Sequence, residues 1–545
     1  MNLAAPGLQI ARAIPDRWPR HEPAPAFSDL FMPLDDLLIG GGDPRLALDR
    51  PRGVNGYGCR PFPSPEIWSF ASSTASPISE RAYARAGLAR EKLMRAVLAV
   101  GFEEAFDRRV EGMREELRHL LGFEAAEADV VFSPSGTDSQ LHALFLTRAL
   151  LGPRITTIVV GSDQTGSGTA FTARGRHFSQ VAVSGRPVRK DTPIAGLSCD
   201  SVGLPLTDQL SDIRARANVD LAVLDAIEIA VAAGSGVLLQ IMDSSKLGWR
   251  APSDACLDEI ASRWPDEVAI VVDACQMRLS RRRLRSFLHR GYMVLVTGSK
   301  YFGGPAFSGA LLVPACQART LACGGEGEPS GLLEYACCSD WPKRWVTLRT
   351  QFEPRFNLGQ WLRWEAALEE IKSYYDVPYE FRVFALREFR IGIESLIALS
   401  PSLRSLTTSA TGCPGEDEEF SGPTIFPVTP YRAGRALSAA DCRVIYQLLG
   451  HDFSDSIGVT DGDREVAGLR CLVGQPVRIE RRGEQPSGAL RLCLAARQVT
   501  EAWSADPQLA RENLEREVDR IAGVIAKVEL LLAKGPDLSE LGGAT

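Results

Sequence analysis

The chain has 545 residues, of which 45% are hydrophobic and 24% charged, so it can bury a large core and is longer than one compact domain usually is. Its formal net charge of -7 argues against nonspecific binding to nucleic acid, which requires a positive field. No apolar run reaches the roughly 20 residues that a membrane helix needs, and the N-terminus does not have the pattern of a signal peptide. We therefore expect a soluble, cytoplasmic protein that binds neither nucleic acid nor membranes.

Two predicted regions cover the first 400 residues. Residues 1–60 are rich in proline and glycine without a sustained period, which predicts an arm that wraps another surface. From 61 to 400, short apolar runs bounded by turn residues alternate with helical stretches. The runs lie at 130–132, 155–160, 237–242, 268–272, 292–296 and 310–313. Such runs are typical of buried strands, so we predict a large α/β domain with a mostly parallel, seven-stranded type of sheet between helices.

A smaller α+β domain is predicted for residues 401–545. Segments 423–428 and 488–494 have the character of strands, and the segment 439–449 between them is helical. The tail carries one helical stripe of apolar residues, at Leu514, Val518, Ile521, Ile525, Val528 and Leu532. We expect this last helix to pack on its own domain.

The cysteines, histidines and clustered arginines are interpreted as structural. The 12 cysteines and six histidines lack the paired spacings of zinc sites, so we expect reduced thiols and no metal. One stretch is rich in arginine, and we interpret it as a solvated helix face. It contains Arg278, Arg281, Arg282, Arg283 and Arg285.

Asp273 ends one predicted strand, and Lys300 follows the next. Parallel strands place their carboxyl ends at one edge of a sheet, where ligands bind in such folds, so the two side chains are expected to emerge there. Pyridoxal chemistry requires a lysine joined to the cofactor aldehyde as a Schiff base and a carboxylate that keeps the pyridine nitrogen protonated. Taken alone, the two residues fit a buried ion pair equally well.

A third feature of the sequence favours a pyridoxal cofactor over the buried ion pair. The predicted strand at 130–132 runs into Ser135, Gly136 and Thr137, and a helix follows. A helix start of this composition presents backbone N–H groups and hydroxyls to an anion, and the helix dipole adds to the attraction. The turn alone is also typical of an ordinary helix cap. The sequence thus contains a turn suited to a phosphate, then the aspartate and then the lysine. Together, in this order, they predict bound pyridoxal 5′-phosphate.

From about residue 65 to 500 the sequence resembles the fold-type I pyridoxal-phosphate enzymes, and within them the class V aminotransferase and cysteine desulfurase group. The resemblance implies that Ser135, Gly136 and Thr137 hold the phosphate. It also implies that Asp273 pairs with the ring nitrogen and that Lys300 carries the cofactor.

The resemblance extends to further contacts. It implies that Gln276 lies near the cofactor hydroxyl and that Thr297 touches the phosphate. Ser245 stands where the group usually has an asparagine in a turn at the cofactor. Arg491 looks like the arginine that binds the substrate carboxylate, a task suited to its planar fork; a surface arginine on an edge strand is the alternative.

The sequence also departs from the group. Ser299 precedes Lys300 where histidine is common, and the place of the ring-stacking histidine falls within residues 163–168. Gln164 and Thr165 are the candidate cofactor contacts there. Cys471 lies a couple of positions before the place of the desulfurase nucleophile, which disfavours a cysteine desulfurase.

The leading hypothesis is an enzyme that acts at the α-carbon of an amino acid or related amine, with the amine of Lys300 as the base. Transamination ranks first, and β-elimination or C–S bond cleavage is the alternative. A non-catalytic binding module is disfavoured because it has no use for all three cofactor features. By the same resemblance we expect a homodimer in which Asn357, at the start of a predicted helix, reaches the partner's cofactor phosphate.

Overall fold

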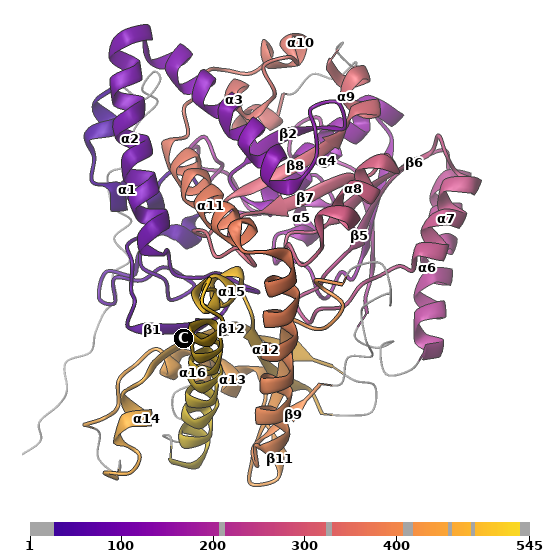
Figure 1. The fold of residues 1–545 in the computed structure, drawn as a ribbon. Coiled ribbons are helices and arrows are strands. Elements are labelled where there is room, and N and C mark those ends of the chain that lie inside the picture. Colours follow the sequence, from indigo (N-terminus) through magenta and orange to yellow (C-terminus); the bar gives the residue numbers. More distant parts are fainter. Residues whose placement is uncertain are drawn as a thin grey trace, which may run out of the picture.

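The larger sheet of the fold is mostly parallel (Figure 1). The computed structural model describes residues 27–206, 213–322, 330–406, 418–455, 460–480 and 485–534. Within them, a seven-stranded sheet has the order β2-β8-β7-β6-β5-β3-β4, in which only β8 runs antiparallel to its neighbours. The strands are β2 (Ala128–Ser133), β3 (Ile155–Val160), β4 (Asp200–Leu204), β5 (Gly236–Met242), β6 (Val268–Asp273), β7 (Met293–Thr297) and β8 (Gly309–Pro314). The predicted α/β class is confirmed; β4 was missed because its side chains are largely exposed and form no apolar run.

Helices cover both faces of this sheet. Successive strand residues point to opposite sides, so Val271 packs in one hydrophobic cluster and Val272 in another. One face is covered by α4 (Gly136–Leu151), α9 (Ala315–Ala322) and α10 (Val346–Arg349). The other is covered by α2 (Glu80–Val100), α3 (Phe102–Leu121), α6 (Ile213–Ala232), α7 (Asp254–Arg263), α8 (Arg281–His289) and α11 (Leu358–Asp376). The short elements α5 (Thr169–Thr172), η3 (Leu332–Glu334) and η4 (Cys338–Asp340) lie in connections.

A second sheet organises the C-terminal part of the chain. Among the described residues it has six strands, in the order β1-β12-β13-β10-β11 with β9 beside β10. They are β1 (Ile67–Phe70), β9 (Leu403–Ser405), β10 (Ile425–Arg432), β11 (Arg435–Ala436), β12 (Arg470–Ile479) and β13 (Ser487–Cys493). Its helices are α12 (Tyr379–Leu399), α13 (Ala439–Leu449), α14 (Arg464–Gly468), α15 (Ala496–Ala502) and α16 (Pro507–Lys534). The predicted strands near 423 and 488 and the predicted helices are present, but β1 joins this sheet although it precedes the larger one in sequence.

The described part of the N-terminal arm is anchored on its own chain. It forms η1 (Phe27–Phe31), α1 (Leu34–Ile39) and η2 (Pro44–Leu46). Arg363 of α11 is buried and donates from Nη1 to the carbonyl oxygens of Leu38 and Gly40, at 3.0 and 2.6 Å. These bonds satisfy carbonyls at the end of α1 and bring the following residues toward the carboxyl edge of the larger sheet.

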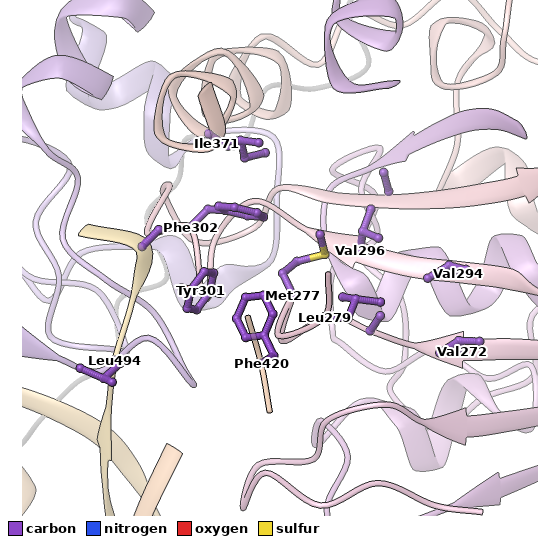
Figure 2. Packing of buried hydrophobic residues seen from close by; sticks show 14 of the residues in the cluster. Val272, Met277, Leu279, Val294, Val296, Tyr301, Phe302, Ile371, Phe420 and Leu494 are labelled. Carbon is purple, nitrogen blue, oxygen red and sulfur yellow. The ribbon is translucent and has the colours of Figure 1, made fainter. Parts of the chain in front are cut away.

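Tyr301 and Phe302, directly after Lys300, lie in the core between the two sheets. Figure 2 shows them among Met277, Ile371 and Phe420, with Leu494 from the end of β13 on the other side. The Tyr301 hydroxyl donates to that of Tyr374 at 3.0 Å, and its carbonyl oxygen accepts from the backbone N–H of Ala496 at 2.8 Å. The two residues that follow Lys300 are therefore anchored in the core, and Tyr301 connects the parts of the chain that carry the two sheets.

The interpretation of the arginine-rich stretch as a solvated face is wrong for Arg281 and Arg283, which are partly buried, and most clearly for Arg278. This guanidinium is buried and donates to Thr424 Oγ1 at 2.9 Å and to Ser72 Oγ at 2.7 Å, so it joins segments from both sheets. Arg282 and Arg285 of α8 are exposed, as expected. The described cysteines form no disulfide, and the described residues hold no cluster of His, Cys, Asp and Glu suited to a metal. No helix of the described chain is long and apolar enough to cross a membrane.

Candidate active site

A cavity of about 340 Å³ opens at the carboxyl edge of the larger sheet. Asp273 ends β6, Lys300 follows β7, and Ser135 stands between β2 and α4, so all three reach it from separate strands. Eleven of the predicted site residues line this cavity: Ser135, Gly136, Thr137, Gln164, Thr165, Asp273, Gln276, Thr297, Ser299, Lys300 and Arg491. Residues far apart in the sequence thus meet where ligands bind in α/β folds.

The start of α4 forms one wall. Ser135 caps the helix, and the backbone N–H groups of Gly136 and Thr137 belong to its first turn, where an α-helix has no internal acceptors. A Cβ on Gly136 would lie 2.6 Å from Cys275 Sγ, and one on Gly309 would lie 2.3 Å from the carbonyl carbon of Ser135. Two glycines therefore let the helix start approach the ends of β6 and β8 closely, leaving its N–H groups at the cavity.

Asp138 lies buried in the same turn. Its Oδ2 accepts a hydrogen bond from the Ser135 hydroxyl at 2.5 Å, while Oδ1 has no partner in the described structure. Burial raises the pKa of Asp138 to about 7, opposed by the hydrogen bond from Ser135 and by the charge of Arg45. Near neutral pH this carboxyl therefore titrates beside the helix start.

Asp273 is held from one side only. Its Oδ1 accepts from the backbone N–H of Cys275 at 3.1 Å, and Oδ2 has no hydrogen-bond partner among the described residues. The hydroxyl of Thr297 donates to the carbonyl oxygen of Cys275 at 2.7 Å, which joins the ends of β6 and β7. One carboxylate oxygen is thus fixed by the backbone, and the other remains available to a group in the cavity.

Lys300 does not pair with Asp273. Its amine makes no ion pair or hydrogen bond with a protein group within the described ranges, although the residue lines the cavity. The structure therefore does not form the ion pair that was an equally good interpretation of the two residues. An unpaired amine and a half-satisfied carboxylate face one cavity.

Arg491 enters the cavity from β13. It is 2% exposed, and within the described residues it has no acidic partner; burial lowers its pKa. Its Nε and Nη2 donate to the carbonyl oxygen of Gln475 at 2.8 and 2.5 Å, Nη2 donates to Thr74 Oγ1 at 2.9 Å, and Nη1 to the carbonyl oxygen of Lys246 at 3.3 Å. This burial excludes the alternative of a surface arginine. The guanidinium group already donates to neutral oxygens of the protein, so only one N–H, on Nη1, is left for an incoming carboxylate.

The side-chain amide of Gln276 is also hydrogen-bonded to protein groups. Its Nε2 donates to the carbonyl oxygen of Ser73 at 3.1 Å, and its Oε1 accepts from Arg278 at 2.8 Å. The side chain lines the cavity but serves to hold Arg278 and the loop after β1.

Two predicted site residues do not line the cavity. The hydroxyl of Ser245 accepts from the backbone N–H groups of Leu247 and Trp249, both at 3.1 Å, and its neighbours Ser244 and Lys246 face the cavity instead. Asn357 caps α11 and donates to the carbonyl oxygen of Gly41 at 2.7 Å, away from the cavity of its own chain. Cys471 is buried in β12, and burial raises its pKa to about 11.

Several residues that line the cavity are not among the predicted site residues. Lys246 lies one position from the predicted turn residue, and the turn pattern gave its side chain no role. The others come from the N-terminal arm, the loop after β1 and the bulge of β12, which carry no recognisable motif; they include Arg45, Tyr57, Ser73, Thr74 and Gln475. Only the folding of these distant segments onto the sheet edge brings them together.

No protein-family model and no curated protein matches the sequence. Solved structures to which this chain is similar include mouse CSAD, at 17% identity and a TM-score of 0.45 over 84% of each chain. A NifS-like protein has 14% identity and a TM-score of 0.46 over 84% of this chain and 99% of that one. The cysteine desulfurase CsdA from Escherichia coli has 15% identity and a TM-score of 0.46 over 84% of this chain and 94% of that one. At these identities, the assignment of function rests on the site.

The cavity fits pyridoxal 5′-phosphate by the chemistry of its donors. The first turn of α4 offers N–H groups to a phosphate, Lys300 offers an unpaired amine to an aldehyde, and Asp273 offers a free oxygen to a protonated ring nitrogen. Each of the three groups is unsatisfied on the cavity side in the described structure. A single ligand with these three features would satisfy them together.

Proposed function

We propose that this protein is a pyridoxal-phosphate-dependent enzyme of fold type I that acts at the α-carbon of an amino acid. Within that class, the motifs at Ser135, Asp273 and Lys300 favour the class V aminotransferase and cysteine desulfurase group. The observation that carries the proposal is the unpaired amine of Lys300 in one cavity with Asp273 and the start of α4.

Each residue has a separate task in this proposal. The bound cofactor supplies an electron sink for the bond that breaks at the substrate α-carbon. The carboxylate of Asp273 keeps a proton on the ring nitrogen, and the N–H groups of Gly136 and Thr137 orient the phosphate. The Lys300 amine takes the proton from the α-carbon as general base. Arg491 attracts the substrate carboxylate and orients the α-carbon toward Lys300.

Transamination is the first candidate reaction, and β-elimination or C–S cleavage is the second. Both begin with loss of the α-proton to the same base. Sulfur transfer through a protein persulfide is disfavoured because Cys471 is buried in β12, away from the cavity, and its raised pKa disfavours the nucleophilic thiolate. The two candidates differ in their products: a transaminase releases one keto acid per site until an acceptor is added, whereas a lyase releases ammonia continuously. Product analysis with one amino acid at a time separates them.

A homodimer is part of the proposal. The turn at 356–359 leads into α11, and Asn357 is the residue proposed to reach the partner's cofactor phosphate. Its side chain already binds Gly41 of its own chain at 2.7 Å, so this contact requires Asn357 to exchange that partner. Sedimentation at several protein concentrations, with activity measured at high dilution, tests the dimer; a fully active monomer would contradict it.

The central test is covalent attachment. The purified protein is incubated with pyridoxal 5′-phosphate, reduced with borohydride and digested, and the modified peptide is identified by mass spectrometry. We expect one modified lysine, Lys300, and no covalent attachment at the cavity in Lys300→Ala. Lys92→Ala, in the exposed part of α2, is the matched control. Unchanged labelling of Lys300→Ala at another cavity residue would overturn the proposal.

A further inference from the structure

The wall of the active-site cavity carries more positive than negative charge. Its formally charged side chains are the basic residues Arg45, Lys246, Lys300 and Arg491 and the acidic residue Asp273. Arg45 is neutralised by Asp43, with Nε and Oδ1 2.8 Å apart. Lys300 and Asp273 have their tasks in the proposed function. Two cations, Lys246 and Arg491, are left without an acidic partner among the described residues.

These two cations are neighbours. The Nη1 of Arg491 donates to the carbonyl oxygen of Lys246 at 3.3 Å. The turn on the other side of Lys246 is held by the Ser245 hydroxyl, which accepts from the N–H of Leu247 at 3.1 Å. The backbone of Lys246 is therefore fixed on both sides, while its ammonium group makes no hydrogen bond or ion pair within the described part of the chain.

Burial and two neighbouring cations disfavour the charged form of the Lys246 side chain. Burial lowers its pKa to about 8, and the charges of Arg491 and Lys300 act in the same direction, against Asp163 and Asp273. Asp243, in the same turn, is engaged by Arg283 at 3.2 Å. Two like charges kept together in a partly buried cavity are costly unless a ligand supplies negative charge.

The phosphate of the cofactor does not account for the excess positive charge of Lys246 and Arg491. Its proposed seat is at the start of α4, and the cation that interacts with Asp138 in that turn is Arg45. Lys246 interacts instead with Arg491, the residue proposed for the substrate carboxylate. Arg491 has one N–H free, enough for one carboxylate contact, which leaves the ammonium of Lys246 for another acidic group.

We propose that Lys246 is a specificity-determining residue that binds a second acidic group of the substrate, so that the preferred substrates are amino acids with an anionic side chain. This inference rests on the proposed function, because it takes the cavity as the substrate site. The alternative is that Lys246 and Arg491 share a single carboxylate.

Calorimetric binding of substrate-like acids tests the inference without turnover. Glutarate and valerate have the same chain length but two and one carboxylates, and their dissociation constants are measured on the cofactor-loaded protein. We expect glutarate to bind the wild type more tightly. Lys246→Met should weaken the binding of glutarate by about 10- to 100-fold, because one charge-assisted contact is lost, and should leave the affinity for valerate unchanged. Lys246→Arg should keep the preference, and Lys92→Met on α2 is the control.

The outcomes separate the possibilities. Equal weakening of both acids in a Lys246→Met protein with wild-type circular dichroism would mean that the two cations share one carboxylate, and it would overturn the inference. So would the absence of any preference in the wild type. Binding of glutarate that depends on Lys246 in a protein that fails to attach the cofactor at Lys300 would sustain the second anion site and overturn the proposed function alone.

Discussion

The Ser135 hydroxyl donates a hydrogen bond to Oδ2 of Asp138 at 2.5 Å and accepts one from the Asp138 backbone N–H at 3.2 Å. The helix cap and the buried carboxyl thus form one unit at the proposed phosphate seat. While Asp138 is ionised, the Ser135 proton is directed into the helix instead of toward the cavity. The protonation state of Asp138 therefore affects both stability and the availability of Ser135 to a phosphate.

Asp138→Asn should stabilise the protein at high pH. Burial raises the pKa of Asp138 from the usual value of an aspartate to about 7 in the fold, so the folded state retains the proton to higher pH than the unfolded chain does. The contribution of this group to the free energy of unfolding consequently falls as pH rises from about 4 to about 7, and stays low above that. Urea unfolding at pH 5 and pH 8 should show a larger gain for Asp138→Asn at pH 8. Asp225→Asn, exposed on α6, should show no such dependence; an equal gain at both pH values would contradict the assignment.

Asp273→Asn should separate turnover from binding. The asparagine oxygen can still accept from the N–H of Cys275, so the end of β6 keeps its geometry. The loss of the negative charge removes the group that keeps the ring nitrogen protonated, and we expect kcat to fall by about 100-fold or more. Cofactor affinity, measured by equilibrium dialysis, should change far less. Turnover close to that of the wild type would show that Asp273 has another role.

Arg491→Lys should weaken the binding of amino-acid substrates. Lysine offers a point charge in place of the fork that now binds Gln475, Thr74 and the Lys246 backbone. We expect a loss on the order of 1.5 to 3 kcal/mol in substrate binding, seen in KM and in direct titration. The binding of amines that lack the carboxylate should be unaffected by the substitution. Equal loss for both classes of ligand would mean that Arg491 only maintains the wall of the cavity.

Tyr301 provides a test of how Lys300 is positioned. Tyr301→Phe keeps the packing shown in Figure 2 but loses the hydrogen bond to Tyr374, and should cost about 1 kcal/mol in urea unfolding. Tyr301→Ala should cost about 3 to 5 kcal/mol because it leaves a cavity in the core. We also expect Tyr301→Ala, but not Tyr301→Phe, to lower the fraction of cofactor attached at Lys300. Full attachment in both variants would show that the loop holds Lys300 without this anchor.

Cys471→Ser should affect stability and spare the reaction. The cysteine is fully buried in β12, so a serine hydroxyl there loses water and should cost roughly 1 to 3 kcal/mol in the free energy of unfolding. The rate of the central reaction per folded site should stay within about twofold. Loss of turnover in a folded Cys471→Ser protein would restore the desulfurase-like alternative.

Several features of this protein could be read from the sequence because they depend on local pattern. The buried strands are continuous apolar runs, and Asp273 and Lys300 follow directly from the ends of two of them. Ser135 caps a helix, which its residue type predicts. The parallel sheet then brings the three together, since its strands share one carboxyl edge.

The tertiary structure alone decided what surrounds these residues. Arg278 belongs to an arginine-rich stretch that looks solvated, yet its guanidinium is buried where it can bind Ser72 and Thr424 from distant segments. Ser245 was placed at the cavity by its motif, but the turn directs its hydroxyl to backbone N–H groups and turns Lys246 to the cavity. A sequence pattern specifies period and local capping. It does not specify which distant carbonyls or charges a side chain will meet, because those partners are set by the packing of the two sheets and the arm.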